Sequence, residues 1–203
     1  MAEQFIKAFG VDVRKLDAVV GSKDAKLLAK LLEDDLAEEV GELEEVHAEL
    51  EQVLREILFG KLVAKREYTY RRVLELVAGV VGRPLPEEAT MPGRGWQDIA
   101  PLWEEWGAPT LTKVWGGAKQ LAWPLAKMKV RWPIAYVVGE AQTARIGKEL
   151  AKFHAGSDIP EGIPRFSEGE WELDDLQREV ESIAAVVRTW CRGDILVWHD
   201  GQQ

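Results

Sequence analysis

Hydrophobic residues recur at helical spacing in several parts of the chain. The clearest case is segment 173–190, where they follow one another at intervals of three or four residues: Leu173, Leu176, Val180, Ile183, Val187 and Trp190. This spacing places them on one face and predicts an amphipathic helix. Acidic residues precede its first turn and Arg188 lies near its end, which suits the helix macrodipole. Weaker patterns predict further helices: 16–20, a helix after an N-cap at Ser22, 33–59, 70–81, 99–106 and 140–153.

Four short segments have the composition of β-strands. Segments 133–138 and 195–199 are continuous runs of apolar residues, and the second has the character of a strand that is covered on both faces. Segments 4–13 and 110–115 are also predicted as strands. Gly139 follows the strand at 133–138 and is predicted to be the N-cap of the helix that follows.

Two segments rich in proline and glycine are predicted as internal loops. They are 83–95 and 155–165. At 203 residues with 46% hydrophobic residues, the chain is long enough for one well-packed core. The sequence therefore predicts a single α+β domain over 1–203, in which a small mixed or antiparallel sheet packs against several amphipathic helices.

Segment 33–59 combines a hydrophobic stripe with a strong negative charge. Between Glu33 and Glu56 it has eleven acidic residues and one basic residue. Hydrophobic residues still recur at intervals of three and four: Leu36, Val40, Leu43, Val46, Leu50 and Val53. The segment is predicted to be a long helix with one packed face and one anionic face.

The anionic face has two interpretations. The simpler one is a helix surface that only contacts water. The alternative is a docking surface for a basic protein partner, with Glu38, Glu42, Glu45 and Glu49 as the candidate contact residues. Both interpretations remain open at the level of sequence.

Six tryptophans lie between residues 96 and 132: Trp96, Trp103, Trp106, Trp115, Trp123 and Trp132. An indole ring provides a large hydrophobic surface and one N–H donor, so it suits either a core or the wall of a pocket. Packing in the core is the preferred interpretation. An aromatic pocket is the alternative, with Trp103, Trp115 and Trp123 as candidate lining residues.

The formal net charge of −9 bears on the class of partner. It opposes general binding to nucleic acid or to an anionic membrane and favours a basic protein partner. Charge reverses between Lys113 and Lys152, where eight basic residues face two acidic ones. This region is predicted to offset the acidic segment, although basic residues beside aromatic ones can also bind nucleic-acid bases and phosphates.

The cysteine content and the N-terminus bear on localisation. Cys191 is the only cysteine, so no disulfide can form within the chain. The first ten residues lack the basic start and apolar run of a secretory signal, and no apolar run is long enough to span a bilayer. We expect a cytoplasmic protein that does not enter the membrane.

The C-terminal half resembles a known family. The segments RWPIAYVVGEAQTARIGKEL and WELDDLQREVESIAAVVRTWCRGDILVWH are similar to the YfbM-like family of bacterial proteins of unknown function. The likeness rests on Trp132, Pro133, Tyr136, Trp190 and Gly193. It covers about 129–199, and a weaker similarity lies near the start of the chain. The resemblance implies a single α+β domain, and it carries over no catalytic residues because none is assigned in that family.

Motifs for common catalytic chemistry are absent from the sequence. His47 has Glu44 and Glu51 at helical spacing, but a dimetal bundle needs this grouping twice. His154 and His199 each have a nearby aspartate, and neither is tied to a nucleophile motif. Cys191 follows a helix end, where a thiolate is disfavoured. We therefore expect no metal and no cofactor.

Two functional hypotheses follow from these patterns. The first is a non-catalytic protein-binding module, of the toxin-neutralising (immunity) or adaptor kind, that uses the acidic helix face. The second is a hydrolase or transferase with a tryptophan-lined pocket beside loop 83–95. The sequence leaves the oligomeric state open.

Overall fold

The computed structural model describes residues 3–34, 37, 50–85, 89–92, 100–117, 119–129, 134–156 and 173–201. Its strands are β1 (Glu3–Gly10), β2 (Arg83–Pro84), β3 (Ala89–Pro92), β4 (Ile134–Val138) and β5 (Ile195–Gly201). Its helices are α1 (Val13–Val19), α2 (Ala25–Leu32), α5 (Leu50–Phe59), α6 (Glu67–Val81), α8 (Ala100–Glu105), α9 (Pro109–Gly117), α10 (Glu140–Leu150) and α11 (Leu173–Trp190), with a 3-10 turn η1 (Ala64–Arg66).

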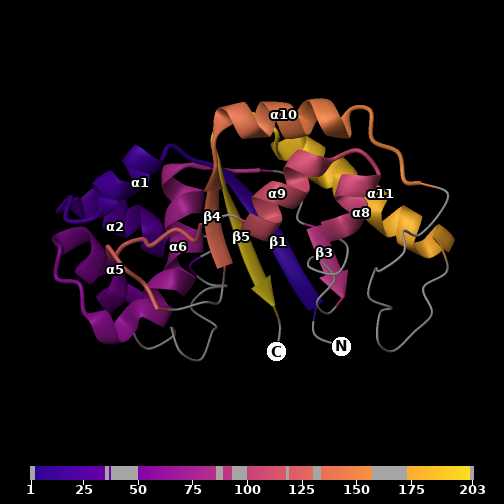
Figure 1. Ribbon diagram of the computed structural model, residues 1–203. Coiled ribbons are helices and arrows are strands. Elements are labelled where there is room, and N and C mark those ends of the chain that lie inside the picture. The colour runs from indigo at the N-terminus through magenta and orange to yellow at the C-terminus, as the bar shows by residue number, and fades with distance from the viewer. Residues whose placement is uncertain are drawn as a thin grey trace.

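The described strands form an antiparallel sheet with the order β2-β1-β5-β4. β1 and β5 pair along almost their full length, from Gln4 opposite Gly201 to Gly10 opposite Ile195. β4 pairs with the other side of β5, while β2 and β3 both pair with the free edge of β1. Because β1 and β5 run in opposite directions, the two ends of the chain lie near each other (Figure 1).

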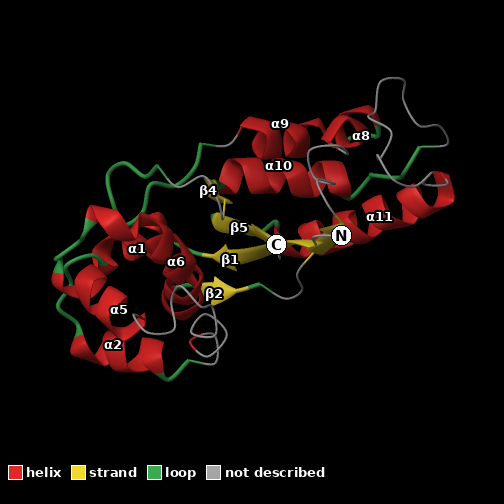
Figure 2. Ribbon diagram, turned by 90° about the horizontal axis from the view of Figure 1, so that it is seen from below, coloured by secondary structure: helices red, strands yellow, loops and turns green. Residues whose placement is uncertain are grey.

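Helices cover both faces of this sheet. α1, α2, α5 and α6 lie on one side, and α8, α9, α10 and α11 lie on the other (Figures 1 and 2). Alternate residues of β5 reach the two sides: Ile195 and Val197 pack with the second group of helices, and Leu196 packs with the first. The predicted α+β fold is confirmed, as is the prediction that the last strand is covered on both faces.

Two predictions about local structure were wrong for the same kind of reason. Segment 110–115 was predicted as a strand, but it lies within helix α9. Loop 83–95 was predicted to be irregular, but it contributes β2 and β3, which pair with β1. In both cases a tertiary contact decides the structure, because hydrogen bonds to distant residues outweigh local composition.

The helix after Ser22 exists, but its N-cap differs from the prediction. The side chain of Asp24 accepts hydrogen bonds from the backbone N–H groups of Lys26 and Leu27, each at 2.9 Å. Ser22 instead accepts a hydrogen bond from the backbone N–H of Asp24 at 3.3 Å. An aspartate and a serine are similar N-caps, so composition did not separate them.

The long helix predicted over 33–59 is confirmed only in its last part. α2 ends at Leu32 and a bend follows at Glu33 and Asp34, so no helix begins at Glu33. α5 forms at Leu50–Phe59 as predicted. Residues 38–49 lie outside the described part of the chain, as do residues 157–165 of the second predicted loop.

Candidate functional site

Helix α5 shows how the acidic segment packs where the structure describes it. Val53, Leu54, Ile57 and Leu58 are completely buried against the first group of helices. On the outer face, Glu51 is exposed and forms an ion pair with Arg55 at 2.6 Å. The predicted division into a packed face and a charged face therefore holds for this helix. The candidate contact residues Glu38, Glu42, Glu45 and Glu49 lie outside the described residues.

Glu56 has a structural role in α5. The Tyr70 hydroxyl donates a hydrogen bond to Glu56 Oε2 at 2.6 Å and accepts one from the backbone N–H of Val63 at 2.7 Å. Arg66 Nε lies 3.4 Å from Glu56 Oε1. Burial and the bond to Glu56 raise the pKa of Tyr70 to about 12. This network joins α5, η1 and α6, and we infer that its role is to stabilise the packing of these helices.

The tryptophans proposed as pocket residues pack in two separate places. Trp103 is fully buried beside Phe153, with ring centroids 5.3 Å apart, in the cluster formed by α8–α11. Trp123 is buried on the other side of the sheet, where its Nε1 donates to the backbone oxygen of Leu16 at 3.1 Å. These two rings therefore do not lie together in one site. The side chain of Trp115 lies outside the described part.

Arg71 on α6 is the most unusual polar residue in the described part of the chain. Its side chain is completely buried among hydrophobic residues of α6 and its neighbours. Nη2 donates a hydrogen bond to the backbone oxygen of Leu121 at 2.6 Å. Nε and Nη1 have no hydrogen-bond partner. Burial lowers the pKa of Arg71 to about 10, so the guanidinium still carries its charge at neutral pH.

The acidic residues one helical turn away from Arg71 are bonded to other groups. Glu67 Oε2 accepts a hydrogen bond from the backbone N–H of Lys129 at 2.7 Å. Glu75 Oε1 forms an ion pair with Lys7 Nζ on β1 at 2.9 Å. Spacing of four residues on a helix usually favours pairing with such carboxylates. Neither carboxylate forms a hydrogen bond to Arg71.

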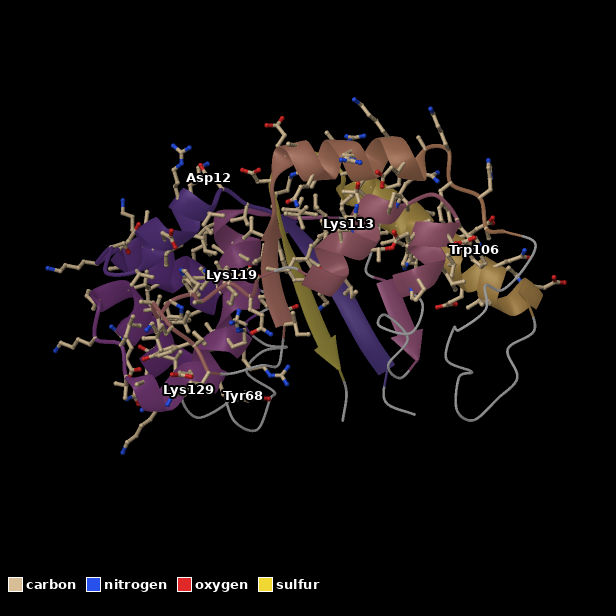
Figure 3. All side chains as sticks on the ribbon, viewed as in Figure 1. Asp12, Tyr68, Trp106, Lys113, Lys119 and Lys129 are labelled. Carbon is tan, nitrogen blue, oxygen red and sulfur yellow. The ribbon has the colours of Figure 1, made fainter. Side chains whose placement is uncertain are left out.

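Segment 119–129 covers Arg71 and ties three parts of the fold together. The backbone N–H of Leu121 donates to the backbone oxygen of Ala135 on β4 at 2.7 Å, so the segment begins at the edge of the sheet. It ends at the first turn of α6, where Lys129 lies beside Tyr68 (Figure 3). Lys119, Lys127 and Lys129 are exposed along it. The cover over Arg71 is therefore basic on its outer side.

Sequence reasoning did not identify Arg71 as a candidate residue. Two signals were present in the sequence. Arg71 precedes Leu74 by three residues and Ala78 by seven, which places it on a packed face of the helix. In addition, segment 106–139 contains five basic residues and no acidic residue. Neither signal shows that the carboxylates of Glu67 and Glu75 are bonded elsewhere, because that depends on tertiary contacts.

The histidines and the cysteine considered as catalytic or metal-binding residues do not form a common site in the described part of the chain. His154 is exposed, and residues 44 and 47 and the side chain of His199 lie outside the description. Burial raises the pKa of the Cys191 thiol to about 11. In the described part of the chain, no group of three or more His, Cys, Asp or Glu residues is arranged to hold a metal ion.

The fold and these sites define an α+β domain in which helices cover both faces of an antiparallel sheet. The chain belongs to the DUF7691 family, described as a domain of unknown function, whose model matches residues 2–199. No curated protein and no solved structure matches the chain. The resemblance to the YfbM-like family is not tested by this match and stays a prediction. Within the described ranges, no helix has the length and hydrophobicity needed to cross a membrane.

Proposed function

We propose that this protein is a non-catalytic binding module that docks a basic protein partner on the acidic face of segment 33–59. A role as a toxin-neutralising or adaptor protein in the cytoplasm fits this proposal. The observation that carries it is the one-sided packing of α5, where Val53, Leu54, Ile57 and Leu58 face the core and Glu51 faces solvent. The same spacing continues toward residue 36 in the sequence.

The charge of the chain supports the same conclusion. Its formal net charge is −9, and eleven of its acidic residues fall between Glu33 and Glu56. A surface with one sign of charge attracts partners of the opposite sign over distance and speeds their association. Such an interaction weakens as salt is added, because exposed charges are screened.

Two charge-neutralised variants that have the same total charge as each other test the proposal. In the test variant, Glu38, Glu42, Glu45 and Glu49 are all replaced by Gln. The control variant carries four changes at exposed carboxylates outside the acidic segment: Asp17→Asn, Glu104→Gln, Glu105→Gln and Asp174→Asn. Both variants lose the same number of negative charges. A difference in the partner that they retain therefore depends on where the charges were removed.

Each protein is immobilised and exposed to native cell extract at low and then moderate salt. We expect wild type and the control variant to retain the same basic protein at low salt. The test variant should retain at least about tenfold less of it, since several close charge contacts are lost. Equal retention by all three proteins, or equal loss from both variants, would contradict the proposal.

The alternative of a hydrolase or transferase has weaker support. It rested on an aromatic pocket, and two of its three candidate residues, Trp103 and Trp123, pack in separate parts of the core.

A further inference from the structure

Arg71 holds a positive charge in the interior without an anionic group bonded to it. The side chain is 0% exposed, and only Nη2 has a partner, the uncharged backbone oxygen of Leu121. Burial of a charge is costly unless a partner of opposite sign and further hydrogen bonds compensate for it. Nε and Nη1 both carry N–H donors, and neither is used.

The segment that covers Arg71 carries positive charge at its surface. Glu67 accepts a hydrogen bond from the backbone N–H of Lys129, and Glu75 forms an ion pair with the side chain of Lys7, so neither carboxylate bonds to Arg71. The covering segment 119–129 contains lysines and no acidic residue, and its lysines are exposed. An anion that approaches this side of α6 therefore meets positive charge first at the surface and then at Arg71.

We propose that Arg71 binds an oxyanion, the carboxylate or phosphate group of a small ligand, between α6 and segment 119–129. The planar guanidinium donates parallel hydrogen bonds to such groups and binds them more strongly than a neutral donor does. The unused donors on Nε and Nη1 supply these bonds. This site differs from the acidic segment 33–59, because it is formed by α6 and segment 119–129 and takes an anion rather than a basic partner.

Entry of a ligand requires segment 119–129 to shift. The hydrogen bonds that hold this segment include the backbone N–H of Leu121 to Ala135, Arg71 Nη2 to the backbone oxygen of Leu121, Trp123 Nε1 to Leu16, and the backbone N–H of Lys129 to Glu67. The Lys129 contact is exposed. We expect the segment to open from this end, where the first turn of α6 meets solvent, while Trp123 stays anchored.

Thermal unfolding in the presence of simple anions tests the site. Inorganic phosphate and succinate serve as the two probes, each compared with chloride at the same ionic strength. A ligand that binds only the folded protein raises the melting temperature. We expect wild type to gain about 3 °C or more with at least one probe, and the probe that acts distinguishes phosphate from carboxylate recognition.

Two variants separate binding at Arg71 from general effects of the salts. Arg71→Met removes the guanidinium and keeps an unbranched, flexible side chain. Arg72→Met is the control: it removes a charge from the next residue, which lies against Tyr68 with its guanidinium carbon 5.2 Å from the ring centroid. Phosphate can also stabilise proteins by exclusion from their surface, and that effect should be equal in all three proteins. We expect R72M to retain the gain and R71M to lose it.

A measurement on the wild-type protein covers the case in which R71M does not fold. The Nε–H resonance of Arg71, identified by its disappearance in Arg71→Lys, should shift as phosphate or succinate is added. An equal gain in melting temperature for R71M and wild type would overturn the proposal. So would the absence of both a thermal gain and a resonance shift in wild type with either probe.

Discussion

Glu149 on α10 accepts two hydrogen bonds from Thr110 at the start of α9. One comes from the backbone N–H at 2.9 Å and the other from Oγ1 at 2.6 Å. The carboxylate satisfies an N–H group that the first turn of a helix leaves free, and it supplies negative charge at the positive end of the helix. A side chain from a helix much later in the sequence thus caps α9.

Replacement of Glu149 by Ala should destabilise the protein. The change removes the cap from α9 and leaves the buried Thr110 without its partner, so we expect the free energy of unfolding to fall by about 1–2 kcal/mol. The ion pair of Glu149 with Arg145 adds little, because Arg145 is largely exposed. Urea denaturation followed by circular dichroism measures the change. Lys148→Ala, at the exposed neighbouring position, is the control, and an equal loss in both variants would contradict the assigned cap.

Gly82 lies where α6 turns back toward the sheet, and we expect it to tolerate no side chain. A Cβ atom there would come 2.7 Å from the backbone oxygen of Ala78 and 2.8 Å from that of Gly10. Both contacts are with backbone, so relief requires α6 or β1 to move. Gly82→Ala should lower the free energy of unfolding by about 2 kcal/mol or more.

Gly10→Ala is the matched control for this contact. Its new Cβ would lie 3.4 Å from Arg83 Nη2, the far end of a flexible side chain. We expect a change below about 1 kcal/mol, because that side chain can move. If thermal or urea unfolding gave the same loss for both glycine variants, the close approach at Gly82 would not be the cause.

Cys191 should react slowly with thiol reagents in the folded protein. Its Sγ donates a hydrogen bond to the backbone oxygen of Val187 at 3.2 Å, and burial raises its pKa to about 11. At pH 8 only about a thousandth of the thiol is ionised, and the rate should rise about tenfold for each pH unit up to that pKa. Iodoacetamide labelling followed by mass spectrometry measures the rate, with urea-unfolded protein as the control. Rapid labelling of the folded protein at pH 7 would contradict this prediction.

Tyr70 should make the stability of the protein sensitive to alkaline pH. Its pKa is about 12 in the folded protein and about 10 in the unfolded chain. The hydroxyl must stay protonated to donate to Glu56, so its contribution is complete below pH 10 and is lost as the pH rises from about 10 through 12. Urea unfolding across this range should show the loss in wild type.

Tyr70→Phe isolates this effect. The variant should show a smaller decline between pH 10 and 12 and should be less stable than wild type at pH 7 by about 1–2 kcal/mol, because Val63 and Glu56 lose a partner. Tyr68→Phe is the control, since Tyr68 is on the same helix and its hydroxyl accepts from Arg72 instead of donating to Glu56. An alkaline decline of the same size in wild type and Y70F would show that other groups cause it.

The sequence by itself determined the elements whose structure is local. The spacing of hydrophobic residues in α11, the run from β4 through Gly139 into α10, and the apolar strand β5 each followed from short-range patterns. These patterns also predicted the α+β class, since amphipathic helices and apolar strands must bury their hydrophobic faces against one another. The packed face of α5 was predicted on the same grounds.

Only the tertiary structure decided the elements that depend on distant partners. α9 has the composition of a strand, and the carboxylate of Glu149 fixes its first turn as a helix. β2 and β3 come from a segment rich in proline and form because β1 offers them a free edge. Arg71 resembles any helical arginine in the sequence. Its unsatisfied charge arises because folding buries it beneath segment 119–129 while Glu67 and Glu75 bond to other groups, and no local pattern records that competition.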